Sequence, residues 1–82
     1  MEKKINQIDA QGFRQGPWES YHHDGNLWSK GSFLDGKRTG YWEYYWFNGN
    51  FMWKGSYLNG IEIGTWEQYD IEGNLKKVIY YH

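Results

Sequence analysis

The sequence contains one short cluster whose side chains could bind a metal ion or transfer protons, His22-His23-Asp24. Zinc sites in proteins need three or four such ligands that converge on one ion. Adjacent residues of an extended chain point to opposite sides, so His22 and His23 cannot readily hold the same ion. We therefore expect solvated histidines beside a turn, and no metal site.

Three glutamates at equal spacing, Glu19, Glu43 and Glu67, could suggest catalytic carboxylates. Glycoside hydrolysis, for example, needs two carboxylates that face each other across a cleft. Here each glutamate recurs in the same Trp-Glu pair, which indicates a structural position on a pleated surface rather than a unique reactive site. We expect no catalytic residue, no cofactor and no enzyme activity.

The elements that position these side chains are three copies of one repeat, which span residues 12–35, 36–59 and 60–82. The copies align without a gap: Trp18, Trp42 and Trp66 are equivalent. Self-similarity at a fixed period, here 24 residues, is typical of repeat architectures. Residues 1–11 precede the repeats, and we expect a polar lead-in or a short edge strand there.

Each copy predicts a β-hairpin, because two extended runs flank a turn signal. In the second copy the signals are Asn48-Gly49 within the hairpin and Asn59-Gly60 after it. Asn-Gly between apolar runs favours a two-residue type I′ turn, in which both central residues have positive φ. No segment has the start and stop signals of a helix. We predict an all-β fold, a single-layer antiparallel meander of three tandem hairpins without a helix.

A two-residue turn fixes which residues face each other across the hairpin. In the second copy it places Phe47 opposite Asn50, Tyr45 opposite Met52, Tyr44 opposite Trp53, Glu43 opposite Lys54 and Trp42 opposite Gly55; in the first copy it places Glu19 opposite Lys30 and Trp18 opposite Gly31. The turns between copies place Gly31 opposite Gly40 and Gly55 opposite Gly64. Since an aromatic ring can protect a strand glycine, we predict that Trp18, Trp42 and Trp66 are structural and cover glycines of the two following strands.

Aromatic residues make up 22% of the chain, with 6 Trp, 8 Tyr and 4 Phe. A single-layer sheet has no second layer to cover rings on both faces, and large exposed apolar patches mark interaction sites. Strand alternation places the predicted binding residues Tyr44, Trp46, Phe51 and Trp53 on the face of the tryptophans, with Trp28 and Tyr45 on the reverse. The cations predicted to contact phosphates or an acidic partner are Arg14, Lys30, Lys37, Arg38 and Lys54.

The pattern G-x-x-x-G-x-W-x-x-Y-x-x-x-G-[ND]-L, followed by K-G-x-[FY] and N-G, resembles MORN repeats over residues 12–81. It is similar to the short variant in bacterial proteins of the YwqK-like antitoxin group. The resemblance implies stacked hairpins in an elongated single-layer sheet that mediates protein contacts, self-association and in some cases lipid contact, without catalysis. The third copy departs from the pattern with Val78-Ile79 in place of Lys-Gly, as expected of a terminal cap.

Charge and composition exclude several partners. The formal net charge is -1, so we expect no attraction to long duplex nucleic acid. No apolar run is long enough to span a bilayer, and no signal peptide is visible, so we expect a cytoplasmic protein.

These features lead to a functional expectation with one alternative. The first is a small binding or sequestering protein that forms a dimer or larger homo-oligomer and binds a protein partner, as an antitoxin would. The alternative is a sponge for a nucleotide or a short oligonucleotide, such as a phage-type inhibitor of host nucleotide-signalling defence. Base stacking on aromatic rings contributes about 1–3 kcal/mol per base, so the sequence leaves both open.

Overall fold

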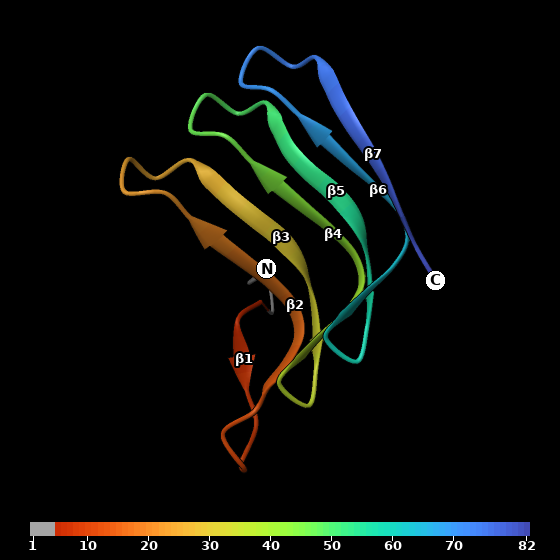
Figure 1. The fold of residues 1–82 in the computed structure, drawn as a ribbon. Helices are drawn as coiled ribbons and strands as arrows, with labels where there is room; N and C mark the ends of the chain where they lie inside the picture. The colour runs from red at the N-terminus through yellow and green to blue at the C-terminus, as the bar shows by residue number, and fades with distance from the viewer. Residues whose placement is uncertain (1–4) are drawn as a thin grey trace.

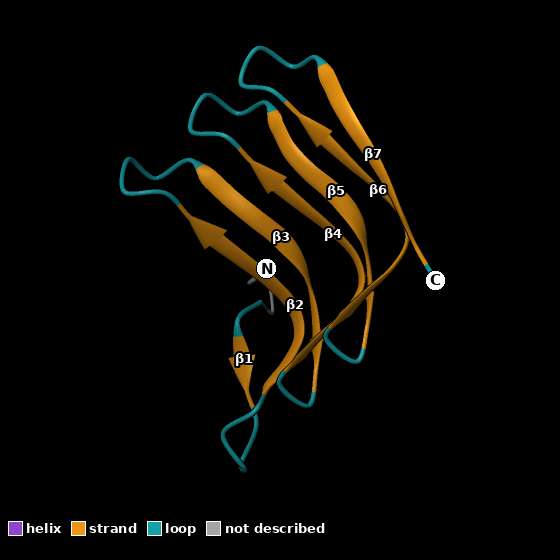
Figure 2. Ribbon diagram, in the orientation of Figure 1, coloured by secondary structure: helices purple, strands orange, loops and turns teal. Residues whose placement is uncertain are grey.

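The computed structural model describes residues 5–82, which form one open antiparallel sheet (Figure 1). Its strands follow chain order, and each pairs with the next: β1 (Gln7–Ile8), β2 (Arg14–Tyr21), β3 (Leu27–Leu34), β4 (Lys37–Tyr45), β5 (Phe51–Leu58), β6 (Ile61–Tyr69) and β7 (Leu75–Tyr81). No helix occurs within residues 5–82 (Figure 2). The prediction of an all-β, single-layer meander of hairpins is confirmed.

The turns that join one repeat to the next have the predicted geometry. Leu34 pairs with Lys37, and Leu58 pairs with Ile61, so each turn has two central residues. Asp35 and Gly36 have φ values of 50° and 80°, and Asn59 and Gly60 have φ values of 51° and 80°. Positive φ at both positions is the signature of a type I′ turn, which matches the twist of the flanking strands.

The loops within the hairpins are longer than predicted, and the two-residue turn expected at Asn48-Gly49 is wrong. The Trp46 amide donates to the Asn50 carbonyl at 2.8 Å, and the Gly49 amide donates to the Trp46 carbonyl at 2.9 Å. Gly49 has a φ of 90°, whereas Asn48 is not left-handed. This is a three-residue loop, a type I turn followed by a left-handed glycine. Phe47 therefore lies within the loop and does not face Asn50.

A β-bulge at Met52 compensates for the longer loop. Tyr45 pairs with Phe51, not with Met52 as predicted, because Met52 is an extra residue without a partner across the strand pair. Beyond the bulge the predicted register is confirmed: Tyr44 pairs with Trp53, Glu43 with Lys54, Trp42 with Gly55, Glu19 with Lys30 and Trp18 with Gly31. An equivalent bulge at Trp28 turns that residue to the opposite face from the one that simple alternation gives it.

A second irregularity sets the position of each buried tryptophan. Ser32 pairs with Thr39 and Lys30 with Glu43, so the three residues 40–42 lie opposite Gly31 alone. The same shift occurs between β5 and β6, around Gly55. The predicted one-to-one pairing of Gly31 with Gly40 and of Gly55 with Gly64 is therefore wrong. The extra residues bend the strand and move the tryptophan side chain toward the preceding strand.

Trp42 and Trp66 consequently cover glycines of the strand before them, not of the strands after them as predicted. A Cβ atom built on Gly31 would overlap the Trp42 indole, and one built on Gly55 would overlap the Trp66 indole. The Trp42 Nε1 donates to the Ser32 carbonyl at 3.0 Å, and the Trp66 Nε1 donates to the Ser56 carbonyl at 3.1 Å. Their exposed fractions are 1% and 4%. We call this arrangement the Trp–Gly contact.

The two edges of the sheet end the repeat in different ways. At the first edge the side chain of Asn6 acts as a strand would: its Nδ2 donates to the Glu19 carbonyl at 2.9 Å, and its Oδ1 accepts from the Glu19 amide at 2.8 Å. Together with β1, this side chain pairs with the outer edge of β2. Residues 1–4 of the lead-in lie outside the described part. At the last edge Ile79 pairs with Trp66 in the position of Gly31 and Gly55. β7 is the last strand of the sheet that residues 5–82 form, and among these residues no further strand places an indole against Ile79.

We expect Gly31→Ala and Gly55→Ala each to lower the free energy of unfolding by about 1–3 kcal/mol, the usual range for overpacking a filled site. The added methyl group would displace the Trp42 or Trp66 indole and its hydrogen bond to the Ser32 or Ser56 carbonyl. Equilibrium denaturation measures the change. Combining Gly31→Ala with Trp42→Phe should give a smaller loss than the sum of the two, because the smaller ring makes room for the methyl group. Strict additivity would contradict a direct contact.

Candidate binding surfaces on the two sheet faces

Six aromatic rings form a continuous row across the face that carries Trp18, Trp42 and Trp66, the Trp face. Each of β2 to β7 contributes one ring, in the order Trp18, Phe33, Trp42, Tyr57, Trp66 and Tyr81. Neighbouring centroids are 4.9–6.4 Å apart, and the ring planes are nearly perpendicular. Edge-to-face packing places the positive edge of one ring against the negative face of the next. This aromatic row is the core of the sheet.

Two arginines lie over the first part of the aromatic row. The Arg14 Cζ is 5.0 Å from the ring centroid of Trp18 and 5.4 Å from that of Phe33. The Arg38 Cζ is 5.3 Å from Trp42 and 5.8 Å from both Phe33 and Tyr57. A guanidinium group at this distance is attracted by the electron-rich ring faces. These two predicted phosphate contacts thus already interact with rings of their own chain.

The Trp face is hollowed over β3 to β7 by an open groove of about 330 Å³, which we call the Trp-face groove. One part is lined by Trp28, Tyr44, Met52 and Trp53, and the other by Tyr57, Glu62, Trp66 and Tyr81. The Tyr44 and Tyr57 hydroxyl oxygens are 3.0 Å apart. Trp28 remains 47% exposed and Tyr81 38% exposed. The groove thus combines aromatic walls with one carboxylate.

The structure divides the predicted binding residues between three places. Tyr44, Trp53 and Trp28 meet in the Trp-face groove. Trp28 was predicted on the reverse face, and that assignment is wrong because the bulge in β3 turns it over. Phe51 was predicted on the Trp face, but the bulge at Met52 places it on the opposite face, where it stacks on Tyr45 at 5.1 Å. Tyr45 lies on the reverse face, as predicted.

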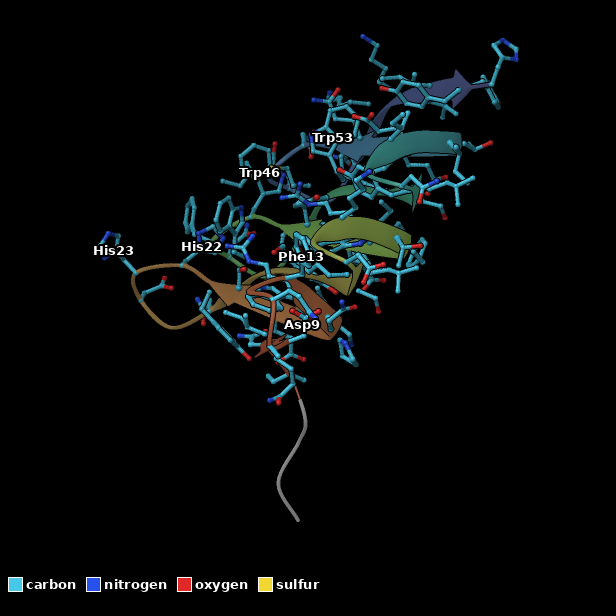
Figure 3. All side chains as sticks on the ribbon, turned by 90° about the horizontal axis from the view of Figure 1, so that it is seen from below. Asp9, Phe13, His22, His23, Trp46 and Trp53 are labelled. Carbon is cyan, nitrogen blue, oxygen red and sulfur yellow. The ribbon has the colours of Figure 1, made fainter. Side chains whose placement is uncertain are left out.

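Trp46 lies at the start of the loop between β4 and β5. It lines neither the Trp-face groove nor the stack of Tyr45 and Phe51 on the reverse face. Its Nε1 donates to the Tyr69 carbonyl at 3.2 Å, one repeat further along. His22, the equivalent residue of the first copy, has its Nε2 3.0 Å from the Tyr45 carbonyl oxygen. Figure 3 shows His22 and Trp46 against the sheet, while His23 projects outward from its loop. Within residues 5–82 no group of three His, Asp or Glu side chains is placed to hold a metal ion.

The reverse face carries a ladder of alternating charge, and we call it the Glu face. Paired residues on β2 to β6 are Glu19, Lys30, Glu43, Lys54 and Glu67, and Val78 ends the row on β7. The predicted pairing of Glu43 with Lys54 holds for the backbone, but the Lys54 Nζ lies 4.0 Å from Glu67. Opposite charges on neighbouring strands each contribute about 0.2–1 kcal/mol. The glutamates are therefore structural positions within the described sheet.

Tyrosines accompany the ladder in every repeat. Tyr21, Tyr45 and Tyr69 donate their hydroxyl protons to Glu19, Glu43 and Glu67 at 2.6, 2.6 and 2.9 Å. Burial raises the pKa of Tyr45, and the hydrogen bond to the Glu43 carboxylate raises it further. Burial alone would lower the pKa of Lys54, but its hydrogen bond to Tyr69 and the charge of Glu67 raise the pKa overall.

The five predicted cations do not converge on one site. Arg14 and Arg38 lie over the aromatic row of the Trp face. Lys30 and Lys54 belong to the ladder of the Glu face, where the Lys54 Nζ is 4.3 Å from the Phe51 ring centroid. Lys37 is exposed beside a turn. A phosphate group on either face could meet only part of this set.

Sequence reasoning missed five residues of these surfaces, Phe33, Met52, Tyr57, Glu62 and Tyr81. Phe33, Tyr57 and Tyr81 occupy one repeat position, and Phe or Tyr at every copy was a visible signal for the aromatic row. Glu62 breaks the repeat pattern in the sequence, because the equivalent residues of the first two copies are Arg14 and Arg38. The positions of Trp28 and Met52 in the Trp-face groove depend on the bulges, which no motif in the sequence indicates.

Comparison of the chain with protein-family models, curated proteins and solved structures finds no significant match. The part of the chain that the structure describes contains no helix long and apolar enough to cross a membrane.

Burial and the hydrogen bond with Tyr44 raise the pKa of Tyr57 above its ordinary value of 10.0. The folded chain therefore keeps the Tyr57 proton at a pH at which the unfolded chain has lost it, so stability is complete below pH 10.0 and falls above it. Denaturation at a series of alkaline pH values measures the free energy of unfolding. This free energy should fall less steeply with pH for Tyr57→Phe than for the wild type. Tyr80→Phe, at a tyrosine that is 71% exposed, is the control. Equal slopes for all three proteins would contradict this assignment.

Proposed function

We propose that this chain is a small, non-catalytic binding protein that uses one sheet face for self-association and the other for a protein partner. The observation that carries the proposal is the Trp-face groove, an aromatic hollow in a single-layer sheet with Trp28 still 47% exposed. Rings and apolar surface gathered in a concave site are typical of recognition surfaces. The resemblance to MORN repeats and to the YwqK-like antitoxin group supports a protein partner.

The Glu face suits self-association. Its row of charges alternates in sign, so a second copy shifted by one strand can place its lysines opposite the glutamates of the first. In a two-fold dimer the same patch of both subunits must be self-complementary, and alternating charge meets that condition. Tyr41, which is 54% exposed beside Lys30 and Glu43, supplies apolar surface for such a contact.

A dimer through one face leaves the other face for a partner. The Glu face also has a hollow, of about 320 Å³, but the charged side chains of Glu19, Lys30 and Glu43 line it. The Trp-face groove is the better partner site, because its walls are mostly aromatic. Interfaces owe much of their affinity to a few aromatic anchors in desolvated pockets. Binding that covers Trp28 and Tyr81 would sequester the partner without any chemical step.

We expect the purified chain to elute as a dimer or larger assembly, with the mass measured by light scattering. Tyr41→Ser should shift the assembly toward monomer, because it removes an exposed ring from the Glu face. Trp28→Ser removes a similarly exposed ring from the Trp-face groove and should leave the mass unchanged. A wild-type monomer, or a Tyr41→Ser variant that assembles normally, would contradict the division of roles.

The nucleotide sponge is tested by titrating the chain with a panel of mono-, di- and cyclic nucleotides while tryptophan fluorescence is recorded. Of the five candidate cations, Arg38 is the one placed against a groove residue, 5.8 Å from Tyr57, and the groove itself carries Glu62. A carboxylate in the site disfavours a phosphate ligand by charge repulsion. We expect no quenching at micromolar nucleotide. Saturable quenching of the tryptophan fluorescence at micromolar nucleotide would favour the nucleotide sponge instead.

A further inference from the structure

The third copy of the repeat lacks the arginine that the first two copies place over the aromatic row. Arg38 pairs with Phe33 across β3 and β4, and its guanidinium lies over Phe33, Trp42 and Tyr57. Glu62 has the same position one repeat later, where it pairs with Tyr57 across β5 and β6. The three rings that correspond to those under Arg38 are Tyr57, Trp66 and Tyr81. All three line the Trp-face groove together with Glu62.

We propose that the Trp-face groove binds an arginine side chain presented by a partner polypeptide, with its guanidinium over Tyr57, Trp66 and Tyr81 and paired with the Glu62 carboxylate. This inference rests on the proposed function and names the chemistry that the partner presents. The chain shows twice, at Arg14 and Arg38, that its row of rings accepts a guanidinium 5.0–5.8 Å from the ring centroids. The third position supplies the rings and a counter-charge, and the cation would come from outside.

The charges around the groove favour one added cation. Arg38 already lies 5.8 Å from Tyr57, so a second guanidinium on the far side of that ring would be repelled if nothing balanced it. Glu62 provides the balancing charge, and no ion pair to Glu62 within 4.0 Å is found among residues 5–82. A planar guanidinium can stack on rings and bind a carboxylate through two parallel hydrogen bonds, which an ammonium group cannot do. Arginine is therefore favoured over lysine.

The size and walls of the groove favour a side chain of a polypeptide over a free cation. A volume of about 330 Å³ lies at the small end of ligand sites, enough for one long side chain and part of a neighbour. Apart from Glu62 and the tyrosine hydroxyl groups the walls are apolar, and Met52, Trp53 and Trp28 form one part of them. An arginine stem and an adjacent apolar residue would cover these walls, whereas a small free cation has no group to place there.

The probe for this inference is the dipeptide N-acetyl-leucyl-arginine amide, titrated into the full chain while the tryptophan indole N–H signals are followed by NMR. We expect saturable shifts of the Trp53 and Trp66 signals, with Trp18, which lies outside the groove, as an internal reference. The citrulline dipeptide, which has the same shape without the charge, should bind more weakly by about tenfold or more. Agmatine, a guanidinium compound without the leucine, should also bind more weakly than the arginine dipeptide.

Glu62→Arg is the decisive variant, because it gives the third copy the arginine of the first two. It should fold, and its own guanidinium should occupy the site, so that dipeptide binding falls by about tenfold or more. Glu72→Arg makes the same change of charge in an exposed loop and should leave binding unchanged. Equal binding of the citrulline dipeptide, equal binding of agmatine, or unchanged binding to Glu62→Arg would overturn the inference. Light scattering on the same samples tests the proposed self-association separately, so either can fail without the other.

Discussion

The structure depends on one contact, an indole laid over a glycine of the preceding strand. A single-layer sheet has no second layer to pack against, so its apolar side chains can be buried only against one another and against its own backbone. Gly31 and Gly55 leave the backbone bare, and Trp42 and Trp66 cover it and donate to the adjacent serine carbonyls. The contact joins each repeat to the one before it, and it aligns the rings that continue as the aromatic row.

This way of burying rings also determines what the two faces can do. The aromatic row occupies much of the Trp face. In the first two repeats an arginine lies over its rings. The third repeat has Glu62 in place of arginine, and Glu62 lines the Trp-face groove together with Tyr57, Trp66 and Tyr81. The Glu face repeats a Glu–Tyr–Lys pattern that satisfies its own charges and hydroxyl groups. The Trp face therefore offers a mostly aromatic groove, and the Glu face offers a row of alternating charges, which we propose meets a second copy.

Most of the fold could be predicted from the sequence, because Asp-Gly and Asn-Gly turns and the fixed repeat period constrain the chain locally. Pairings such as Glu43 with Lys54 followed from counting residues and are confirmed. The bulges at Trp28 and Met52 could not be predicted, since they arise from the fit of a three-residue loop to strands whose register is held elsewhere. That single extra residue moved Trp28 and Phe51 to the opposite faces, which is why the candidate site was only partly foreseen. The direction of the Trp–Gly contact also depended on a bulge, around Gly31.

The Trp–Gly contact is tested most directly by the proton chemical shifts of the glycines. A proton beneath an aromatic ring is shifted strongly upfield, and of the 11 glycines only Gly31 and Gly55 are found against an indole. The account predicts that one Hα of each lies far upfield of the Hα signals of the other glycines, and that the shift of Gly31 disappears in Trp42→Leu. Ordinary shifts at Gly31 and Gly55, indistinguishable from those of Gly40 and Gly64, would contradict it.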